Sequence, residues 1–137
     1  MKRHQTYVKV RYAETDQMGV VHHGVYPQYL EIARLDWLDA LGISYREMEK
    51  NGVMLPVYDM KLQYVQPAHF DDELKVEVVL AEEPRVRIRF VYKIFNKENE
   101  LLTKAETTLV FMDAQTKRPI KCPRYILDRI KGSESEA

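Results

Sequence analysis

The sequence lacks several features that define large classes of proteins. Its 137 residues include one cysteine, Cys122, so an intrachain disulfide is impossible and zinc sites built on several thiolates are excluded. No uninterrupted apolar run approaches the roughly 18 residues that a membrane-spanning helix needs. The first residues alternate in polarity and provide no apolar signal core. These absences predict a cytoplasmic protein with no membrane span.

An excess of charge of either sign is also lacking. Lys and Arg together number 21, and so do Asp and Glu. Without an overall positive field, we expect no binding to nucleic acid. The proportions of hydrophobic residues, 45%, and charged residues, 31%, are those of a globular protein. Because single domains commonly span roughly 100–150 residues, we expect one domain over residues 1–132 and a polar tail over 133–137.

Motifs for several common chemistries are missing as well. Only three serines occur, Ser44, Ser133 and Ser135, and none stands in a Gly-x-Ser-x-Gly elbow, so a serine hydrolase fits poorly. Walker and dinucleotide glycine motifs are absent, so nucleotide-dependent chemistry has no support. Cys122 lies near the end of the chain, outside any motif. We therefore expect no cofactor.

One segment has strong helical periodicity. Its apolar residues recur at steps of four, three, four and four and share one face: Tyr26, Leu30, Ala33, Trp37 and Leu41. Pro27 suits a first helical turn, and Gly42 suits the end. The pattern predicts a helix over residues 27–41, roughly 22 Å long at 1.5 Å per residue. Shorter helices are expected over 45–50 and 123–131.

Much of the remaining chain alternates with a period of two, which is typical of strands. A first strand is expected over residues 7–12, and four further apolar faces begin at Tyr58, Leu74, Val86 and Leu101. The breaks between these strands are too short for parallel crossovers, so an antiparallel meander is expected. Since helix and sheet each have one apolar side, the sheet should wrap around the helix. The predicted class is therefore α+β, a curved antiparallel sheet around one long central helix.

A dense polar cluster precedes the predicted long helix: Tyr12, Glu14, Asp16, His22 and His23. The start of a helix presents unsatisfied N–H groups and partial positive charge, which can polarise a carbonyl. A carboxylate facing that end would complete a hydrolytic pair. Two other interpretations stay open: Thr-Asp before Gly is common turn chemistry, and carboxylates with imidazoles can bind a metal. Neighbouring histidines generally point in different directions, so no metal site is expected.

This cluster is part of a longer stretch that resembles a known family signature. The stretch is Tyr12 to Tyr26, YAETDQMGVVHHGVY, followed by Tyr29 to Arg34, YLEIAR. It closely resembles the 4-hydroxybenzoyl-CoA thioesterase family, particularly its YbgC-like branch, and the order of elements extends the resemblance over most of the chain. The resemblance implies a hot-dog fold and hydrolysis of the thioester of acyl-CoA, with coenzyme A as part of the substrate. It also implies homodimers that join their sheets and pair into homotetramers.

The resemblance implies roles for particular residues. Asp16 matches the catalytic carboxylate, which attacks the thioester carbonyl or activates water. His23 matches a histidine that orients substrate or water, and Tyr12 helps to place Asp16. The carbonyl-polarising position matches the backbone N–H groups around His23 to Val25, and the residues implied to bind substrate are Gly24, Val25 and Tyr26. The sequence departs from the family pattern at two positions: Val25 stands where many relatives have asparagine, and His22 stands where the branch often has an aromatic residue.

Arg87 and Arg89 project from one strand face, together with Lys93. They either bind the phosphates of coenzyme A, for which arginine is well matched, or simply face water. Two other functions also remain open for this scaffold. A hydratase or dehydratase would use Glu14 or Asp16 with His23 as acid and base, and a non-catalytic module would bind acyl-CoA without releasing thiol.

Overall fold

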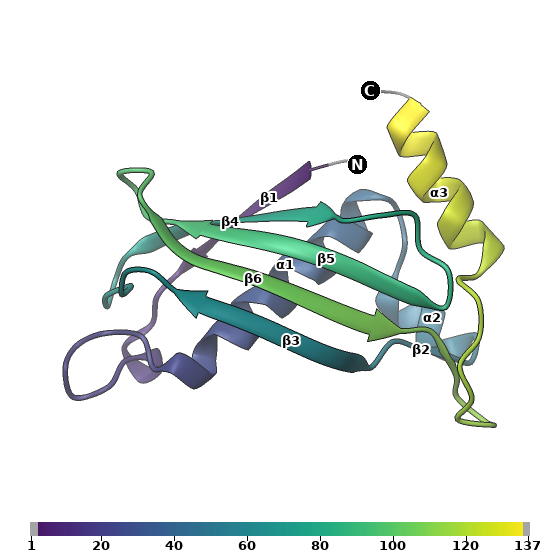
Figure 1. The fold of residues 1–137 in the computed structure, drawn as a ribbon, viewed down its shortest axis with the longest axis horizontal. Helices are drawn as coiled ribbons and strands as arrows, with labels where there is room; N and C mark the ends of the chain where they lie inside the picture. Colours follow the sequence, from purple (N-terminus) through teal and green to yellow (C-terminus); the bar gives the residue numbers. More distant parts are fainter. Residues whose placement is uncertain (1–2, 136–137) are drawn as a thin grey trace.

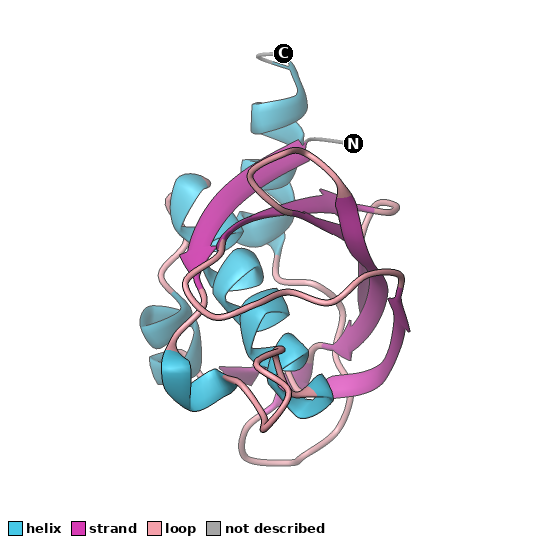
Figure 2. Cartoon of the chain, turned by 90° about the vertical axis from the view of Figure 1, so that its left-hand side faces the viewer, coloured by secondary structure: helices cyan, strands magenta, loops and turns pink. Residues whose placement is uncertain are grey.

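The computed structural model describes residues 3–135, and its main element is a five-stranded antiparallel sheet (Figure 1). The strand order is β1-β4-β5-β6-β3. Its strands are β1 (Arg3–Lys9), β3 (Val57–Tyr64), β4 (Glu73–Leu80), β5 (Arg87–Phe95) and β6 (Leu101–Val110). Figure 2 shows the sheet curving around helix α1 (Tyr26–Ala40). The predicted α+β arrangement is therefore confirmed.

Shorter elements complete the fold. They are the 3₁₀ helices η1 (Tyr12–Glu14) and η2 (His23–Val25), helices α2 (Tyr45–Lys50) and α3 (Arg124–Ser135), and the paired strands β2 (Val53–Met54) and β7 (Met112–Asp113). Helix α3 continues beyond the predicted end at residue 131, so the predicted tail begins inside a helix. Residues 136–137 of that tail lie outside the described part of the chain. Within residues 3–135, no helix has the length and hydropathy that crossing a membrane requires.

Helix α1 follows the predicted periodicity within one residue at each end. Leu30, Ala33 and Trp37 are almost fully buried on the side that faces the sheet. The ring of Trp37 packs edge-on against Phe90 of β5, with the centroids 5.1 Å apart. The helix ends before Gly42, whose φ of 75° is a left-handed conformation that glycine adopts without strain.

The buried side of the sheet follows the predicted alternation in β4, β5 and most of β6. In β4, each apolar residue of the predicted face is at most 1% exposed: Leu74, Val76, Val78 and Leu80. At roughly 1.5–3 kcal/mol for each large aliphatic side chain removed from water, these four form a substantial part of the core. The predicted apolar face of β5 is equally buried: Ile88, Phe90, Tyr92 and Ile94.

The structure corrects the expected course of two strands. β1 lies at residues 3–9 rather than 7–12, because residues 12–14 turn into η1. The predicted meander is also wrong in part, since β3 pairs with β6 and the following link crosses to β4 on the other side of the sheet. A bulge between Val57 and Asp59 moves Tyr58 off the predicted face, and Tyr58 lies beneath the guanidinium of Arg87.

Strand β3 is an edge strand with an incompletely covered apolar face. Helix α1 packs on β1 and β4. Openings lined by residues of both α1 and β3 remain between those two elements. Tyr64 is 48% exposed, and Met60 and Leu62 are only partly buried. The expectation that this face is buried is therefore only partly met in the single chain, because no element within residues 3–135 covers it completely. We call this opening the α1–β3 seam.

Candidate active site at the start of helix α1

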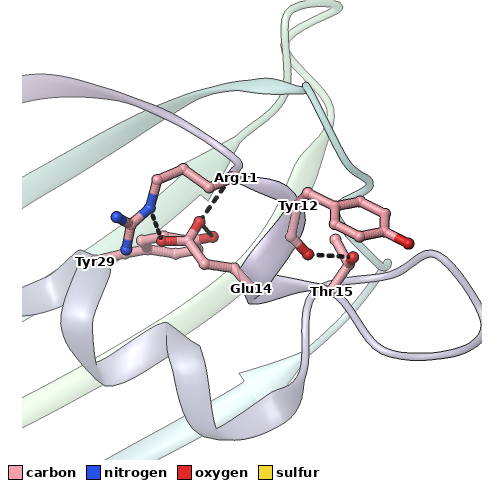
Figure 3. A network of polar contacts seen from close by, with 5 residues as sticks. All are labelled: Arg11, Tyr12, Glu14, Thr15 and Tyr29. Carbon is pink, nitrogen blue, oxygen red and sulfur yellow. Dashed lines mark hydrogen bonds and ion pairs between the residues drawn. The ribbon is translucent and has the colours of Figure 1, made fainter.

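The loop between β1 and α1 is anchored by a buried carboxylate (Figure 3). Glu14, 7% exposed, accepts hydrogen bonds from the backbone N–H of Arg11 (2.9 Å), from Nε of Arg11 (3.0 Å) and from the hydroxyl of Tyr29 (2.8 Å). Its own carbonyl accepts from the backbone N–H of His22 at 2.9 Å. Burial acts to raise the pKa of Glu14, but these hydrogen bonds outweigh burial and the pKa is lowered. Glu14 therefore joins the end of β1, the entry to the helix and α1 itself.

Asp16 lies at the base of an exposed turn that Glu14 and Thr15 support. Thr15 pairs with Val21 across the turn, and the backbone N–H of Asp16 donates to the carbonyl of Val20 at 2.9 Å. Oδ1 of Asp16 accepts from the backbone N–H of Met18 (2.8 Å) and, more weakly, of Val20 (3.4 Å). Oδ2 has no protein partner within the described residues. The turn interpretation is thus realised through one oxygen, and the other oxygen is available to a ligand.

The two histidines that follow form a stacked pair at the entry to α1. Their ring centroids lie 4.2 Å apart. The backbone N–H of Gly24 donates to Nδ1 of His22 at 3.0 Å. The backbone N–H of Val25 donates to the carbonyl of His22 at 2.9 Å. Two of the three N–H groups expected to polarise a substrate carbonyl, those of Gly24 and Val25, are therefore engaged within the loop. The backbone N–H of His23 has no hydrogen-bond partner among the described residues.

A cleft of about 240 Å³ lies beside this entry, at one end of the α1–β3 seam. It is lined by His23 and Tyr26 from the start of α1 and by the segment that ends β3: Tyr64, Val65, Gln66 and Pro67. The hydroxyl of Tyr64 donates to the carbonyl of His23 at 3.0 Å, and its ring packs against Tyr26. Tyr26 is buried, which raises the pKa of its phenol. The cleft therefore has an aromatic wall and one imidazole.

The remaining predicted residues, Asp16 among them, do not line this cleft. Tyr12 is 76% exposed and packs edge-on against Phe70, while its carbonyl accepts from the hydroxyl of Thr15 at 2.7 Å. Tyr12 thus contacts the turn that holds Asp16 rather than the Asp16 carboxylate. Arg87 lies over Tyr58, and Arg89 pairs with Glu106 at 3.6 Å. Both arginines lie at the end of the sheet opposite the cleft. Ile88, which stands between them, pairs with Leu109, and Leu109 also pairs with Val57 at the start of β3. The cleft adjoins Tyr64, at the other end of β3.

Two parts of the site were missed by reasoning from the sequence. Tyr64 is 41 residues from His23, and only the pairing of β3 with β6 brings it to the cleft. The partner of Glu14, Tyr29, did have a signal, because it lies one turn into the predicted helix on the side nearest the cluster. Within residues 3–135, no group of three His, Cys, Asp or Glu side chains is arranged to hold a metal ion.

The chain is similar to several known proteins. Residues 10–130 match the thioesterase-like superfamily. The Bacillus subtilis protein YneP is 35% identical over 114 residues, 83% of each chain. The acyl-CoA thioester hydrolase YbgC of Escherichia coli is 32% identical over 124 residues, 90% of this chain and 92% of YbgC. The structure of a DHNA-CoA thioesterase from Staphylococcus aureus is similar with a TM-score of 0.90 and 35% sequence identity. The match covers 99% of this chain and 95% of the Staphylococcus aureus chain.

The chain therefore belongs to the thioesterase-like superfamily, and its fold is the hot-dog fold. The resemblance seen in the Tyr12–Arg34 region is confirmed, and so is the predicted class of enzyme, a thioester hydrolase.

Proposed function

We propose that this protein hydrolyses acyl-CoA thioesters at the start of α1, with Asp16 as the reacting carboxylate. The observation that carries the proposal is that His23 borders a cleft at the start of α1, while the exposed carboxylate of Asp16, outside the cleft lining, lies on the same loop, in a member of a thioesterase superfamily. Acyl-CoA as substrate is supported by the relative YbgC, which is named an acyl-CoA thioester hydrolase.

The free oxygen of Asp16, Oδ2, can serve either of two balanced reactions. As a nucleophile it forms a mixed anhydride with the acyl group and releases the coenzyme A thiolate, after which water hydrolyses the anhydride. As a general base it takes a proton from water, the hydroxide adds to the carbonyl, and the thiolate leaves and is protonated. The hydrogen bonds of Oδ1 hold the carboxylate in one orientation for both. Each reaction needs only water, so no cofactor or metal takes part.

The loop supplies groups that can stabilise negative charge on the carbonyl oxygen. The backbone N–H of His23 points to no protein acceptor among the described residues, and the helix start adds partial positive charge. The N–H groups of Gly24 and Val25 become available only if a substrate displaces their bonds to His22. His23 and the Tyr26 ring border the cleft and orient the thioester. Tyr12 holds the turn of Asp16 through Thr15.

In the proposed assembly, two copies of the chain form a homodimer in which their β3 edge strands pair in an antiparallel manner. β3 has one hydrogen-bonded neighbour, and an unpaired edge with exposed apolar residues is a site for strand pairing. Antiparallel pairing about a two-fold axis brings the Val57 end of one β3 to the Tyr64 end of the other. Pairing of dimers into tetramers completes the proposed assembly.

This dimer gives the two arginines a role that one chain does not offer. Within a protomer, Arg87 and the cleft are separated by most of the length of β3, about 23 Å at 3.3 Å per residue. Antiparallel pairing moves the partner's Arg87 toward the cleft. We propose that Arg87 and Arg89 bind the phosphates of coenzyme A held mainly by the other protomer. A cytoplasmic location fits a coenzyme A ester substrate and an unpaired Cys122.

A thiol-release assay with short-chain, long-chain and aromatic acyl-CoAs tests the function. Asp16→Asn keeps the shape and removes the charge, and we expect hydrolysis to fall by about 100-fold or more with binding retained. Asp39→Asn, at an exposed position near the far end of α1, is the matched control and should keep the wild-type rate. A chelator should leave the rate unchanged.

The same assay separates the alternatives. A hydratase would consume an enoyl-CoA double bond without releasing thiol, and a binding module would bind acyl-CoA and release none. Equal rates for wild type and Asp16→Asn would remove Asp16 from the mechanism.

A further inference from the structure

A buried cation in the middle of α1 has no counter-charge among the residues that the structure describes. Arg34 is 8% exposed, and Nη1 donates to the hydroxyl of Tyr92 at 3.1 Å. Tyr92 in turn shares a hydrogen bond with Thr107. Among the described residues, no carboxylate oxygen lies within 4.0 Å of the Arg34 guanidinium. A guanidinium stays protonated, so a full positive charge is buried here without an anion.

The phenols around Arg34 do not supply that anion. Burial raises the pKa of Tyr92, although the charge of Arg34 acts to lower it. Burial also raises the pKa of Tyr45, which feels the same charge. Both hydroxyls therefore stay neutral near pH 7. Glu31 is exposed to solvent and forms no ion pair with Arg34. A buried charge without a partner is strongly unfavourable, which indicates that something outside this chain completes the site.

Arg34 borders a pocket that is otherwise mostly apolar. The pocket has a volume of about 340 Å³, and its apolar walls include Leu35, Leu38, Leu55, Phe90 and Leu109. Ligand pockets begin at about 300 Å³, so this space suits a small acyl group. Glu31 and Tyr45 also line it. An apolar cavity with one buried, incompletely bonded cation fits a mainly hydrocarbon group that carries an anionic oxygen.

The pocket lies in the same α1–β3 seam as the cleft at His23. The cleft is lined by Tyr26 and Tyr64. The pocket is lined by Arg34, in the middle of the same helix, and by Val57, at the other end of the same strand. Arg34 follows Tyr26 by eight residues, about 12 Å along the helix at 1.5 Å per residue. A thioester at the cleft can therefore direct its acyl chain along the seam toward Arg34.

We propose that this pocket selects acyl groups with a carboxylate at the end remote from the thioester, and that Arg34 is the specificity-determining contact. The inference rests on the proposed thioester hydrolysis and names its substrate class, ω-carboxyacyl-CoA. A carboxylate neutralises the buried charge and accepts two parallel N–H bonds from the guanidinium. A hydroxyl or a methyl end leaves the charge unbalanced. Reaction at the thioester is unchanged, and the remote carboxylate takes no part in bond breaking.

The first test compares two substrates of equal chain length in the wild-type enzyme. Suberyl-CoA ends in a carboxylate and octanoyl-CoA in a methyl group. Succinyl-CoA and butyryl-CoA form a shorter pair with the same difference. In at least one pair, we expect kcat/KM to be about tenfold higher or more for the carboxylate-ended substrate than for the methyl-ended one. A factor of this size matches the contribution of a hydrogen bond to a charged group. Equal or higher values for both methyl-ended substrates would overturn the proposal.

The second test removes the cation. Arg34→Met replaces a buried charge with an apolar chain of similar length, and we expect the preference for the carboxylate to disappear while octanoyl-CoA is hydrolysed at least as well as before. Arg46→Met, at an exposed position on α2, is the matched control and should keep the wild-type ratio. If Arg34→Met does not fold, the wild-type comparison still decides.

Two further outcomes are informative. If wild type hydrolyses no acyl-CoA, the proposed function fails, and calorimetric binding of suberyl-CoA against octanoyl-CoA then tests the pocket by itself: tighter binding of suberyl-CoA supports it. If Arg34→Met dissociates an oligomer in sedimentation and leaves the substrate ratio unchanged, a carboxylate of a second copy is the partner of Arg34, and the proposal is overturned.

Discussion

The carboxylates Glu14 and Asp16 are two positions apart and have different environments. Glu14 is buried and accepts three hydrogen bonds, whereas Asp16 is exposed and uses one oxygen to hold its own turn. Buried carboxylates are found paired because an unpaired one is costly. Glu14 therefore has the environment of a structural anchor, and Asp16 that of a group left free to react.

Replacing Glu14 by Gln should destabilise the protein by about 1–3 kcal/mol, because a buried charged acceptor is lost and an amide N–H₂ cannot accept from Arg11. The folded-state pKa of Glu14 is lowered, so its charge stabilises the fold at neutral pH, and that contribution is lost as pH falls below the unfolded carboxyl pKa of about 4.3 and through the folded value. Urea unfolding at several pH values measures this.

The control for that experiment is Glu98→Gln, at an exposed position between β5 and β6. Its stability should match that of wild type at every pH. A difference between wild type and Glu14→Gln that does not shrink on acidification would contradict an ionised Glu14.

At the scale of elements, the end of α1 depends on one backbone conformation. Gly42 has a φ of 75°, and a Cβ there would lie 2.7 Å from Nη1 of Arg129 in α3. That same Nη1 donates to the carbonyl of Leu41 at 3.3 Å. The end of α1 is therefore capped by a residue from α3, which links the last helix to the central one.

Gly42→Ala should lower the free energy of unfolding by about 1 kcal/mol or more, because alanine is strained at positive φ. Gly52→Ala is the matched comparison, since Gly52 has a φ of 82° and no atom near its Cβ position. The loss should be larger at Gly42, where Arg129 must also leave Leu41. Thermal melts of both variants measure the difference, and a stabilised Gly42→Ala would refute the account.

For the whole molecule, the open α1–β3 seam is the dominant feature. The central helix covers the β1 side of the sheet and leaves apolar residues of β3 exposed. A second copy joined at β3 would cover them and border both the His23 cleft and the Arg34 pocket. Assembly and substrate binding would then share one surface.

Leu62→Lys should weaken the proposed dimer, because it introduces a charge into the partly buried face of β3. Tyr7→Lys places the same charge at an exposed position on β1, the other edge, and should leave assembly unchanged. Sedimentation velocity at matched concentrations measures the result. A monomeric wild type, or equal effects of the two substitutions, would reject pairing through β3.

Local features of this protein were predictable from its sequence because they depend on neighbouring residues. The alternation of Leu74 to Leu80 specified which side of β4 is buried, and Gly42 specified where α1 ends. The Thr15–Asp16 turn was also evident from residue type. Periodicity and backbone preference act within a few residues, so no knowledge of the distant chain was needed.

Other features were decided only by the tertiary structure. Three features join residues 39 or more apart in the sequence: the pairing of β3 with β6, the bond from Tyr64 to His23 and the burial of Arg34 beside Tyr92. Strand order depends on which long-range pairing buries the most apolar surface overall. A local pattern states which face of a strand is apolar, and only the folded chain determines what covers that face.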